Sequence, residues 1–209
     1  MLNVTWPVPV ASVFQRFNRV VRDLATTCGK RVRLETAGED TEIDKGMIEL
    51  LGDPLTHLVR NAVDHGLEPE ADRLAAGKSP EGKVSLVART EGGSVTIDVC
   101  DDGKGLDRDR IHRKAIERGL LRPEDNPTEE QILGMILQPG FSTAATITDV
   151  SGRGVGLDVV KRNVERLNGT LQVESEPGKG SVMRIRLPLT LAILDGLVLS
   201  VGAHPFVVP

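Results

Sequence analysis

Four separated segments of the chain carry residue types that could together bind a phosphorylated ligand. They comprise residues 57–66, 101–105, 140–144 and 152–157. The first is polar and includes an amide, the second is an acidic Asp-x-Gly-x-Gly turn, and the last is a Gly-x-Gly-x-Gly turn. Glycine turns let backbone N–H groups approach an anion, whereas amide oxygens can bind a metal ion. Together the segments indicate one phosphate-handling site.

The first segment presents a polar face if it is helical. His57, Asn61 and His65 are spaced by four residues, which places them on one side of a helix. An Asn amide oxygen is a hard, neutral ligand that can complete the coordination of Mg²⁺ already held by phosphates. The alternative is a solvated polar stripe. Asn61 is therefore the candidate metal ligand, and Asp64 and His65 are candidate ligand contacts beside it.

Asp101 follows an apolar strand and opens the first glycine turn. Its carboxylate can accept a hydrogen bond from the exocyclic amine of adenine. It would reject guanine, which presents a carbonyl there, because an unpaired buried charge costs on the order of 2–5 kcal/mol. Gly103 and Gly105 allow close backbone approach. The alternative is an ordinary acidic β-turn, and Asp102 is expected to be a solvated neighbour.

The second glycine turn opens a predicted helix, where free backbone N–H groups can cradle an anion. Its spacing also fits a dinucleotide fingerprint, but no convincing parallel strand precedes it and no ribose-binding acidic residue follows in a βαβ context. Arg153 either faces phosphate or is a solvated charge. The candidate ligand contacts here are Gly152, Arg153, Gly154, Val155, Gly156 and Leu157.

In this order the segments resemble the N, G1, F and G2 boxes of the GHKL nucleotide-binding superfamily, which includes histidine kinases, gyrases, Hsp90 and MutL. They are most similar to the catalytic core of CheA-type chemotaxis histidine kinases, from about Val13 onward. The resemblance implies ATP and Mg²⁺ as ligands and gives Asn61 the metal. At the position of His57, ATPases of the superfamily generally carry a water-activating glutamate. A histidine there favours transfer to a protein acceptor, unless it only caps local polar groups.

The resemblance also gives roles to residues outside these turns. The stretch between Gly105 and Gly152 is too long for a structureless connection and is predicted to be an ATP lid. Lys114 within it is a candidate phosphate contact or an ordinary surface lysine. Phe141 is expected to pin this stretch to the domain. Ser142 and Thr143 are candidate ligand contacts, and so is Ser181 near the adenine.

Composition excludes several classes of protein. A net charge of −4 and few aromatic residues argue against a nucleic-acid-binding surface. The longest apolar stretch, residues 187–203, is interrupted by Pro188, Asp195 and Gly196, so no membrane span is predicted. Cys28 and Cys100 form no metal pattern and are expected to be buried thiols in a reducing compartment. With no recognisable signal peptide, the sequence predicts a cytoplasmic location.

Hydrophobic periodicity predicts the elements that must position these residues. Within a long helix over residues 45–64, Pro54 is expected in the first turn of a second helical segment, with Asp53 as its N-cap. Gly92-Gly93 predicts a hairpin. Further helices are expected over 10–27, 68–76, 107–118, 128–137 and 155–167. Strands are expected over 31–36, 41–44, 83–90, 94–100, 170–175, 181–187, 191–194 and 197–201.

Hairpins alternating with amphipathic helices predict an α+β fold, a two-layer α/β sandwich with a mixed, largely antiparallel sheet and helices on one face. The resemblance implies the same architecture, the Bergerat fold. It assigns residues 1–27 to the end of a dimerisation helix and linker, 28–188 to the ATP-binding kinase core, and 189–209 to the start of a truncated SH3-like regulatory domain.

The implied function is that of the ATP-binding catalytic domain of a two-component, chemotaxis-type histidine kinase. It would transfer the γ-phosphoryl group of ATP to a histidine on a separate phosphotransfer domain. A GHKL ATPase clamp and a non-catalytic nucleotide-binding scaffold remain alternatives. The implied partners are the phosphotransfer domain, a CheW-like coupling protein bound through the regulatory domain, and a downstream response regulator. The chain itself is expected to be monomeric and its parent protein dimeric.

Overall fold

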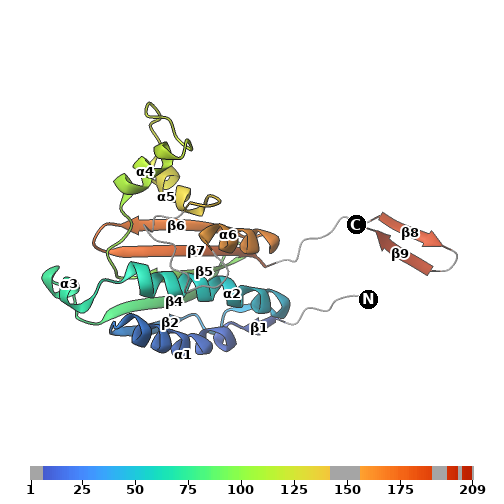
Figure 1. Cartoon of the computed structure of the whole chain (residues 1–209). Coiled ribbons are helices and arrows are strands. Elements are labelled where there is room, and N and C mark those ends of the chain that lie inside the picture. The colour runs from blue at the N-terminus through green and yellow to red at the C-terminus, as the bar shows by residue number, and fades with distance from the viewer. Residues whose placement is uncertain (1–6, 142–155, 190–196, 202–203, 209) are drawn as a thin grey trace.

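A five-stranded mixed sheet forms the centre of the computed structural model (Figure 1). The strands lie in the order β2-β4-β5-β7-β6, with β2 parallel to β4 and the other neighbours antiparallel. The strands are β2 (Val32–Ala37), β4 (Gly82–Glu91), β5 (Ser94–Asp101), β6 (Thr170–Glu176) and β7 (Gly180–Pro188). The predicted mixed, largely antiparallel sheet is thus confirmed. The structure describes residues 7–141, 156–189, 197–201 and 204–208.

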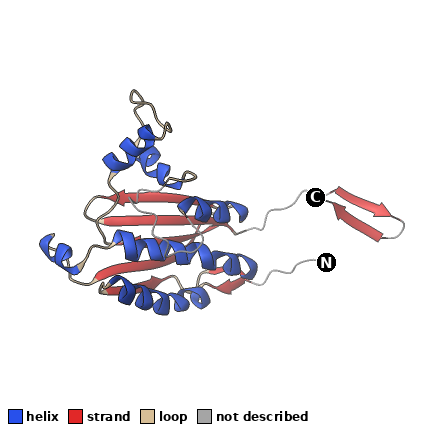
Figure 2. Ribbon diagram, viewed as in Figure 1, coloured by secondary structure: helices blue, strands red, loops and turns tan. Residues whose placement is uncertain are grey.

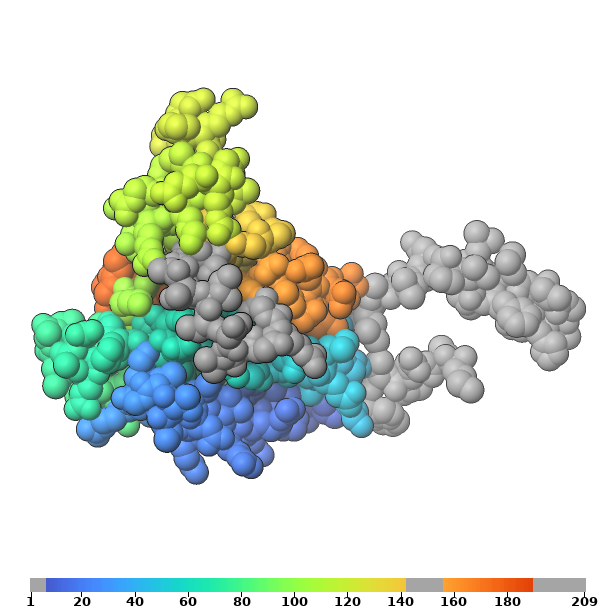
Figure 3. Space-filling view, viewed as in Figure 1, coloured from blue at the N-terminus to red at the C-terminus, as the bar shows by residue number. Residues whose placement is uncertain are grey.

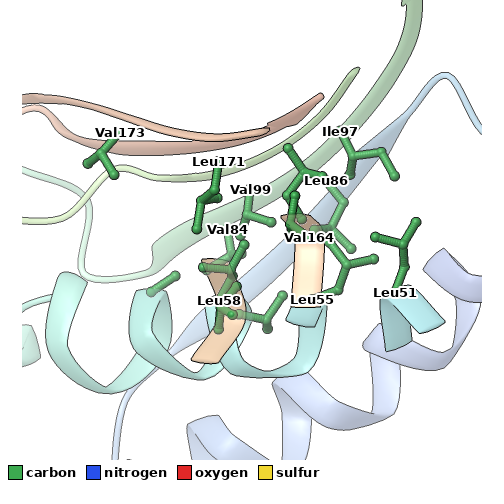
Figure 4. Packing of buried hydrophobic residues seen from close by; sticks show 14 of the residues in the cluster. Leu51, Leu55, Leu58, Val84, Leu86, Ile97, Val99, Val164, Leu171 and Val173 are labelled. Carbon is green, nitrogen blue, oxygen red and sulfur yellow. The ribbon is translucent and has the colours of Figure 1, made fainter. Parts of the chain in front are cut away.

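Three amphipathic helices cover one face of the sheet (Figure 2). They are α1 (Ala11–Cys28), α2 (Lys45–Asn61) and α6 (Leu157–Arg166). Their apolar stripes meet the inward side chains of the strands in one core (Figure 4), which includes Leu51, Leu55, Leu58, Val84, Leu86, Ile97, Val99, Val164, Leu171 and Val173. α1 contributes Phe14 and Phe17 to this core as well. The burial of these apolar side chains is the main stabilising contribution to the two-layer packing.

α2 corrects one prediction from the sequence. The long helix predicted from residue 45 is present, but the second segment with Asp53 as its N-cap is wrong, because α2 continues through Pro54 and has Asp44 as its N-cap. The Asp44 carboxylate accepts a hydrogen bond from the backbone N–H of Met47 at 3.1 Å. Pro54 lacks one backbone donor but is buried in the core, so its apolar contacts offset the lost helix bond.

α2 does not extend to Asp64 as an α-helix. From Ala62 to Gly66 the chain forms one π-helical turn, η1, whose bond from the N–H of Leu67 to the carbonyl of Ala62 measures 2.9 Å. Single π-helical turns inserted in α-helices are frequent at functional sites. The first polar segment therefore spans the junction of two helix types.

The remaining elements surround this core. α4 and the residues after it project from the body of the molecule as the yellow-green part of the space-filling view (Figure 3). No helix among the described residues has the length and apolar character needed to cross a membrane. These elements are β1 (Pro7–Pro9), β3 (Glu42–Asp44), α3 (Glu70–Ala75), α4 (Arg108–Glu117), α5 (Glu129–Gly134), the 3₁₀ turn η2 (Met135–Leu137), β8 (Leu197–Val201) and β9 (His204–Val208).

The predicted strand over residues 197–201 is confirmed as β8, which pairs with β9 in an antiparallel hairpin. The strand predicted over residues 191–194 lies outside the described residues. The hairpin predicted at Gly92-Gly93 is also confirmed, and both glycines have positive φ, 55° and 74°, which a tight turn between twisted strands requires.

Gly180 offers a test of the β6–β7 turn. It has a φ of +115°, and an added Cβ would lie 1.9 Å from the carbonyl oxygen of Asp101. We expect Gly180→Ala to lower the free energy of unfolding by about 3 kcal/mol or more in a urea titration. Gly178→Ala is the control, because its φ is 78° but nothing lies within 4 Å of the added Cβ. A loss for Gly180→Ala no larger than the control's, about 1 kcal/mol, would contradict the clash.

Candidate functional site

The end of α2 carries two of the predicted site residues, one helical turn apart. His57 and Asn61 are both half-buried, whereas His65 lies exposed on η1. Burial lowers the pKa of His57, and the neighbouring charges of Arg60 and His65 act in the same direction. Asp158 in the first turn of α6 opposes this shift in pKa. His57 is therefore neutral near pH 7 and is a weaker base than an ordinary histidine.

Asp158 was not singled out by the sequence analysis. Its carboxylate lies at the start of α6 and forms an ion pair with Arg162 at 2.8 Å. The start of α6 was predicted to receive phosphate, and Gly156 and Leu157 begin this helix as expected. The carboxylate places a negative charge close to that helix start, where the macrodipole stabilises it.

Asp64 belongs to η1, and its side chain lies close to Cys28 at the end of α1. One carboxylate oxygen is 3.9 Å from the thiol of Cys28, and the other is 3.7 Å from the imidazole of His65. Cys28 and Cys100 are both free and half-buried. Burial raises the pKa of the Cys28 thiol, and the charge of Asp64 raises it further, so this thiol is a poor nucleophile.

Lys30 fixes the π-helical turn. Its ammonium donates to the carbonyls of Val63 at 2.9 Å, Asp64 at 2.6 Å and Leu67 at 2.9 Å. All three ammonium donors are thereby used on carbonyls at the end of a helix, where a cation is favourable. Burial lowers the pKa of Lys30. This role of Lys30 could not be predicted from the sequence, because the stretch around Gly29 carries no ligand-binding signature.

Asp101 ends β5 and faces the end of the first polar segment. An added Cβ on Gly66 would lie 3.0 Å from the carboxyl carbon of Asp101, a tight contact that would require the carboxylate to shift. Burial raises the pKa of Asp101 to about 6, although the backbone N–H groups of Gly103 and Ser181 donate to its carboxylate and oppose the rise. The bond from Gly103 measures 2.9 Å. The structure thus brings Asp101 together with Ser181, its partner in the β5–β7 register.

The glycines of the Asp101 turn make close contacts within the protein itself. A Cβ on Gly103 would lie 2.1 Å from the carbonyl oxygen of Gly66, and one on Gly105 would lie 2.4 Å from that of Glu176. The backbone N–H of Lys104 also donates to the carbonyl of Gly66 at 3.0 Å. These glycines allow the turn to join the end of η1 to the β6–β7 turn.

Asp102 corrects another prediction, because it is not a solvated neighbour. Its carboxylate accepts hydrogen bonds from Arg73 and from the backbone N–H of Lys83, both at 2.9 Å. The Arg73 side chain is only 2% exposed and also pairs with Glu68 at 3.1 Å. Without tertiary context, Arg73 and Glu68 are indistinguishable in sequence from the surface charges of a short helix.

The other predicted contacts are placed less completely. Lys114 is half-buried on α4, and Phe141 is buried with the guanidinium of Arg118 5.6 Å from its ring centroid. α4, α5 and η2 occupy the first part of the predicted lid. The candidates that lie outside the described residues are Ser142, Thr143, Gly152, Arg153, Gly154 and Val155.

The site therefore combines three chemical features: a helix end with an amide and a neutral imidazole, a buried carboxylate that accepts hydrogen bonds, and the start of a second helix whose Asp158 acts on His57. Among the described residues, no group of three or more His, Cys, Asp or Glu side chains could hold a metal ion. A hard cation here would need oxygen ligands from a bound phosphate in addition to Asn61.

This fold and this site define a nucleotide-binding domain, and the chain belongs to the family of histidine kinase-, DNA gyrase B- and HSP90-like ATPases, whose pattern matches residues 50–191. The chain is 50% identical to chemotaxis protein CheA of Rhizobium meliloti over 201 residues, which cover 96% of this chain and 26% of that protein. It is also 50% identical to CheA of Salmonella typhimurium, covering 97% of this chain and 30% of that protein. The chain thus spans about a quarter to a third of these relatives.

Solved structures agree on the fold. The catalytic domain of histidine kinase ThkA superposes with a TM-score of 0.56 at 16% identity, covering 89% of this chain and 96% of that one. The histidine kinase domain of the blue-light activated kinase of Erythrobacter litoralis gives a TM-score of 0.52 at 15% identity, covering 90% of this chain and 70% of that one. The predicted two-layer fold of the superfamily is confirmed.

Proposed function

We propose that this chain is the ATP-binding catalytic domain of a chemotaxis-type histidine kinase. It binds Mg-ATP and supports transfer of the γ-phosphoryl group to a histidine on a separate phosphotransfer domain. The observation that carries the proposal is the contact of Gly66 with Asp101, which joins the His57–Asn61 helix end to the buried carboxylate. The similarity to CheA proteins, at about 50% identity over nearly the whole chain, supports the choice of kinase within the family.

Each residue has a distinct task in this proposal. Asp101 accepts the hydrogen bond of the adenine amine, and Ser181 lies beside it. Asn61 completes the coordination of Mg²⁺ held mainly by the phosphates, and the ion neutralises charge on the transferring group when bound. His57 contacts the γ-phosphate without the basicity needed to activate water. Lys114, Ser142, Thr143, Asp64, His65 and the second glycine turn, residues 152–157, are further proposed nucleotide contacts.

The proposal extends to the parent protein. Residues 1–27 would lead in from a dimerising segment, residues 28–188 would be the kinase core, and residues 189–209 would begin an SH3-like regulatory domain. A CheW-like coupling protein would bind that domain, and a response regulator would receive the phosphoryl group. A cytoplasmic location, a monomeric isolated chain and a dimeric parent protein are part of the same proposal.

Phosphotransfer itself is the direct test. Incubation with γ-labelled ATP and a separate histidine-bearing phosphotransfer domain is expected to label that domain with an acid-labile, base-stable phosphoryl group. Labelling should be weak, because the acceptor domain in this reaction is not linked to the chain. A short flexible linker would give it an effective concentration in roughly the mM range. Brisk ATP hydrolysis without labelling of any acceptor domain would contradict the kinase proposal and support an ATPase clamp instead.

His57 separates the two activities. We expect His57→Glu to raise the rate of ATP hydrolysis by roughly tenfold relative to phosphotransfer, because a carboxylate one turn before Asn61 can orient and activate water. The measurement is free phosphate against labelled acceptor in the same reaction. Gln15→Glu adds a carboxylate at an exposed position of α1, outside the proposed site, and should leave the ratio unchanged. An unchanged ratio in folded His57→Glu would remove His57 from the phosphate contact.

A further inference from the structure

We propose that Lys78 is a positioning residue whose ammonium holds the turn that aims Asp101 at adenine. The inference rests on the proposed function, since it concerns the same nucleotide site. Lys78 lies after α3, and its ammonium donates to the carbonyl of Gly103 at 2.7 Å and to that of Asp102 at 3.0 Å. Both carbonyls belong to the turn that follows Asp101.

In two successive peptide groups of this turn, both the carbonyl and the N–H form hydrogen bonds. In the peptide that joins Asp102 to Gly103, Lys78 binds the carbonyl and the N–H donates to the Asp101 carboxylate at 2.9 Å. In the next peptide, Lys78 binds the Gly103 carbonyl and the Lys104 N–H donates to Gly66 at 3.0 Å. A cation at the carbonyl end polarises a peptide group and strengthens its N–H as a donor. Lys78 therefore supports both the position of the Asp101 carboxylate and the junction with η1.

Lys78 is not free to serve as a ligand contact. Its third donor goes to Glu68 at 2.7 Å, so its three donors meet three acceptors, and the side chain is 18% exposed. Glu68 is itself held by Arg73, which also binds Asp102. Lys78 thus belongs to a fixed network behind the turn, and its effect on a nucleotide must pass through Asp101.

A pair of nucleotides isolates this effect from general weakening of the site. The 6-amino group of ATP would donate a hydrogen bond to the Asp101 carboxylate, whereas purine riboside triphosphate lacks this group. Calorimetry of the wild-type chain is expected to give about tenfold tighter binding of ATP. We expect Lys78→Met to weaken ATP binding by about tenfold and to change binding of the analogue by less than about twofold. Combined with Asp101→Asn, Lys78→Met should add no further loss of preference.

Lys83→Met is the matched control. Lys83 neighbours the network through its backbone N–H, but its ammonium forms a half-exposed pair with Glu35 at 3.5 Å and touches no carbonyl of the turn. This variant should keep the full preference for ATP. Circular dichroism checks the fold of each variant. If Lys78→Met does not fold, Lys78→Gln replaces it, because its amide retains a donor. For Lys78→Gln we expect the difference in binding free energy between ATP and the analogue to fall to about half of the wild-type value.

The outcomes separate the inference from the proposed function. A wild-type chain that binds neither nucleotide would overturn the proposed function itself. A wild-type chain that prefers ATP, together with a folded Lys78 variant that keeps that preference or weakens both nucleotides equally, would overturn the positioning role while leaving the nucleotide site in place.

Discussion

Asp101→Asn is expected to give a protein that is more stable than the wild type but binds ATP at least about tenfold more weakly. The amide presents a donor where the adenine amine needs an acceptor, and tenfold corresponds to about 1.4 kcal/mol. The stability gain has a separate cause. The Asp101 pKa of about 6, compared with 3.8 for an unperturbed aspartate, means that the folded state disfavours the ionised carboxylate by up to about 3 kcal/mol at neutral pH.

The sign of the pH dependence follows from this raised pKa. Below pH 3.8 the carboxyl is protonated in both states, so Asp101 imposes no penalty on the folded protein. As pH rises toward 6, the unfolded chain releases its proton first and the wild type loses stability. The advantage of Asp101→Asn should therefore be largest above pH 6 and should shrink between pH 6 and pH 4. Urea titrations across this range measure it.

Asp98→Asn is the matched control on the same strand. The Asp98 carboxylate is buried and pairs with Arg89 at 2.8 Å and with Arg184 at 2.9 Å. The same substitution there removes the buried anion that the two guanidinium groups share and leaves them only their more exposed partners, Glu91 and Glu174. It should destabilise the fold by roughly 1–3 kcal/mol. Equal stability changes at both positions would contradict the raised pKa of Asp101. ATP affinity undiminished in folded Asp101→Asn would contradict the adenine assignment.

Asn61→Asp is expected to reduce phosphotransfer by roughly 100-fold while leaving the fold intact. Asn61 is half-buried at the end of α2, and the substitution changes no packing volume. It replaces a neutral ligand by an anion, which alters the charge around Mg²⁺ and the triphosphate, and it removes the amide donor. The initial rate of acceptor labelling at saturating ATP, measured over a titration with Mg²⁺, is the appropriate readout.

Asn18→Asp provides the comparison for this substitution. Asn18 is an exposed residue of α1, and its amide makes only a long hydrogen bond of 3.4 Å to the carbonyl of Gln15. It should retain the wild-type rate of labelling. Wild-type phosphotransfer by a folded Asn61→Asp variant would remove Asn61 from the metal assignment.

Much of this fold could be predicted because local signals agree with the tertiary structure. The Gly92-Gly93 hairpin and the alternation of β4 and β5 are encoded by neighbouring residues. The uninterrupted course of α2 through Pro54 could not be predicted in this way. The buried contacts that favour a continuous helix come from strands elsewhere in the chain. Local propensity alone favoured a break at that position.

The same distinction applies to the site. The contact between Gly66 and Asp101 agrees with the motif order, since glycine spacing is a local signature. The network of Glu68, Arg73 and Asp102 was missed, because its ion pairs join positions up to 29 residues apart. A charged residue in a short polar helix looks the same in sequence whether it faces water or a buried partner.

The three carbonyls held by Lys30 tie the nucleotide site mechanically to α1. Lys30 follows directly after Gly29, the left-handed residue that ends α1, so little slack separates the helix from its bonds to η1. A displacement of α1 along its axis must either break these bonds or pull the π-helical turn with it. Because Asn61 immediately precedes that turn, a displacement of α1 that moves η1 would also move the proposed metal ligand.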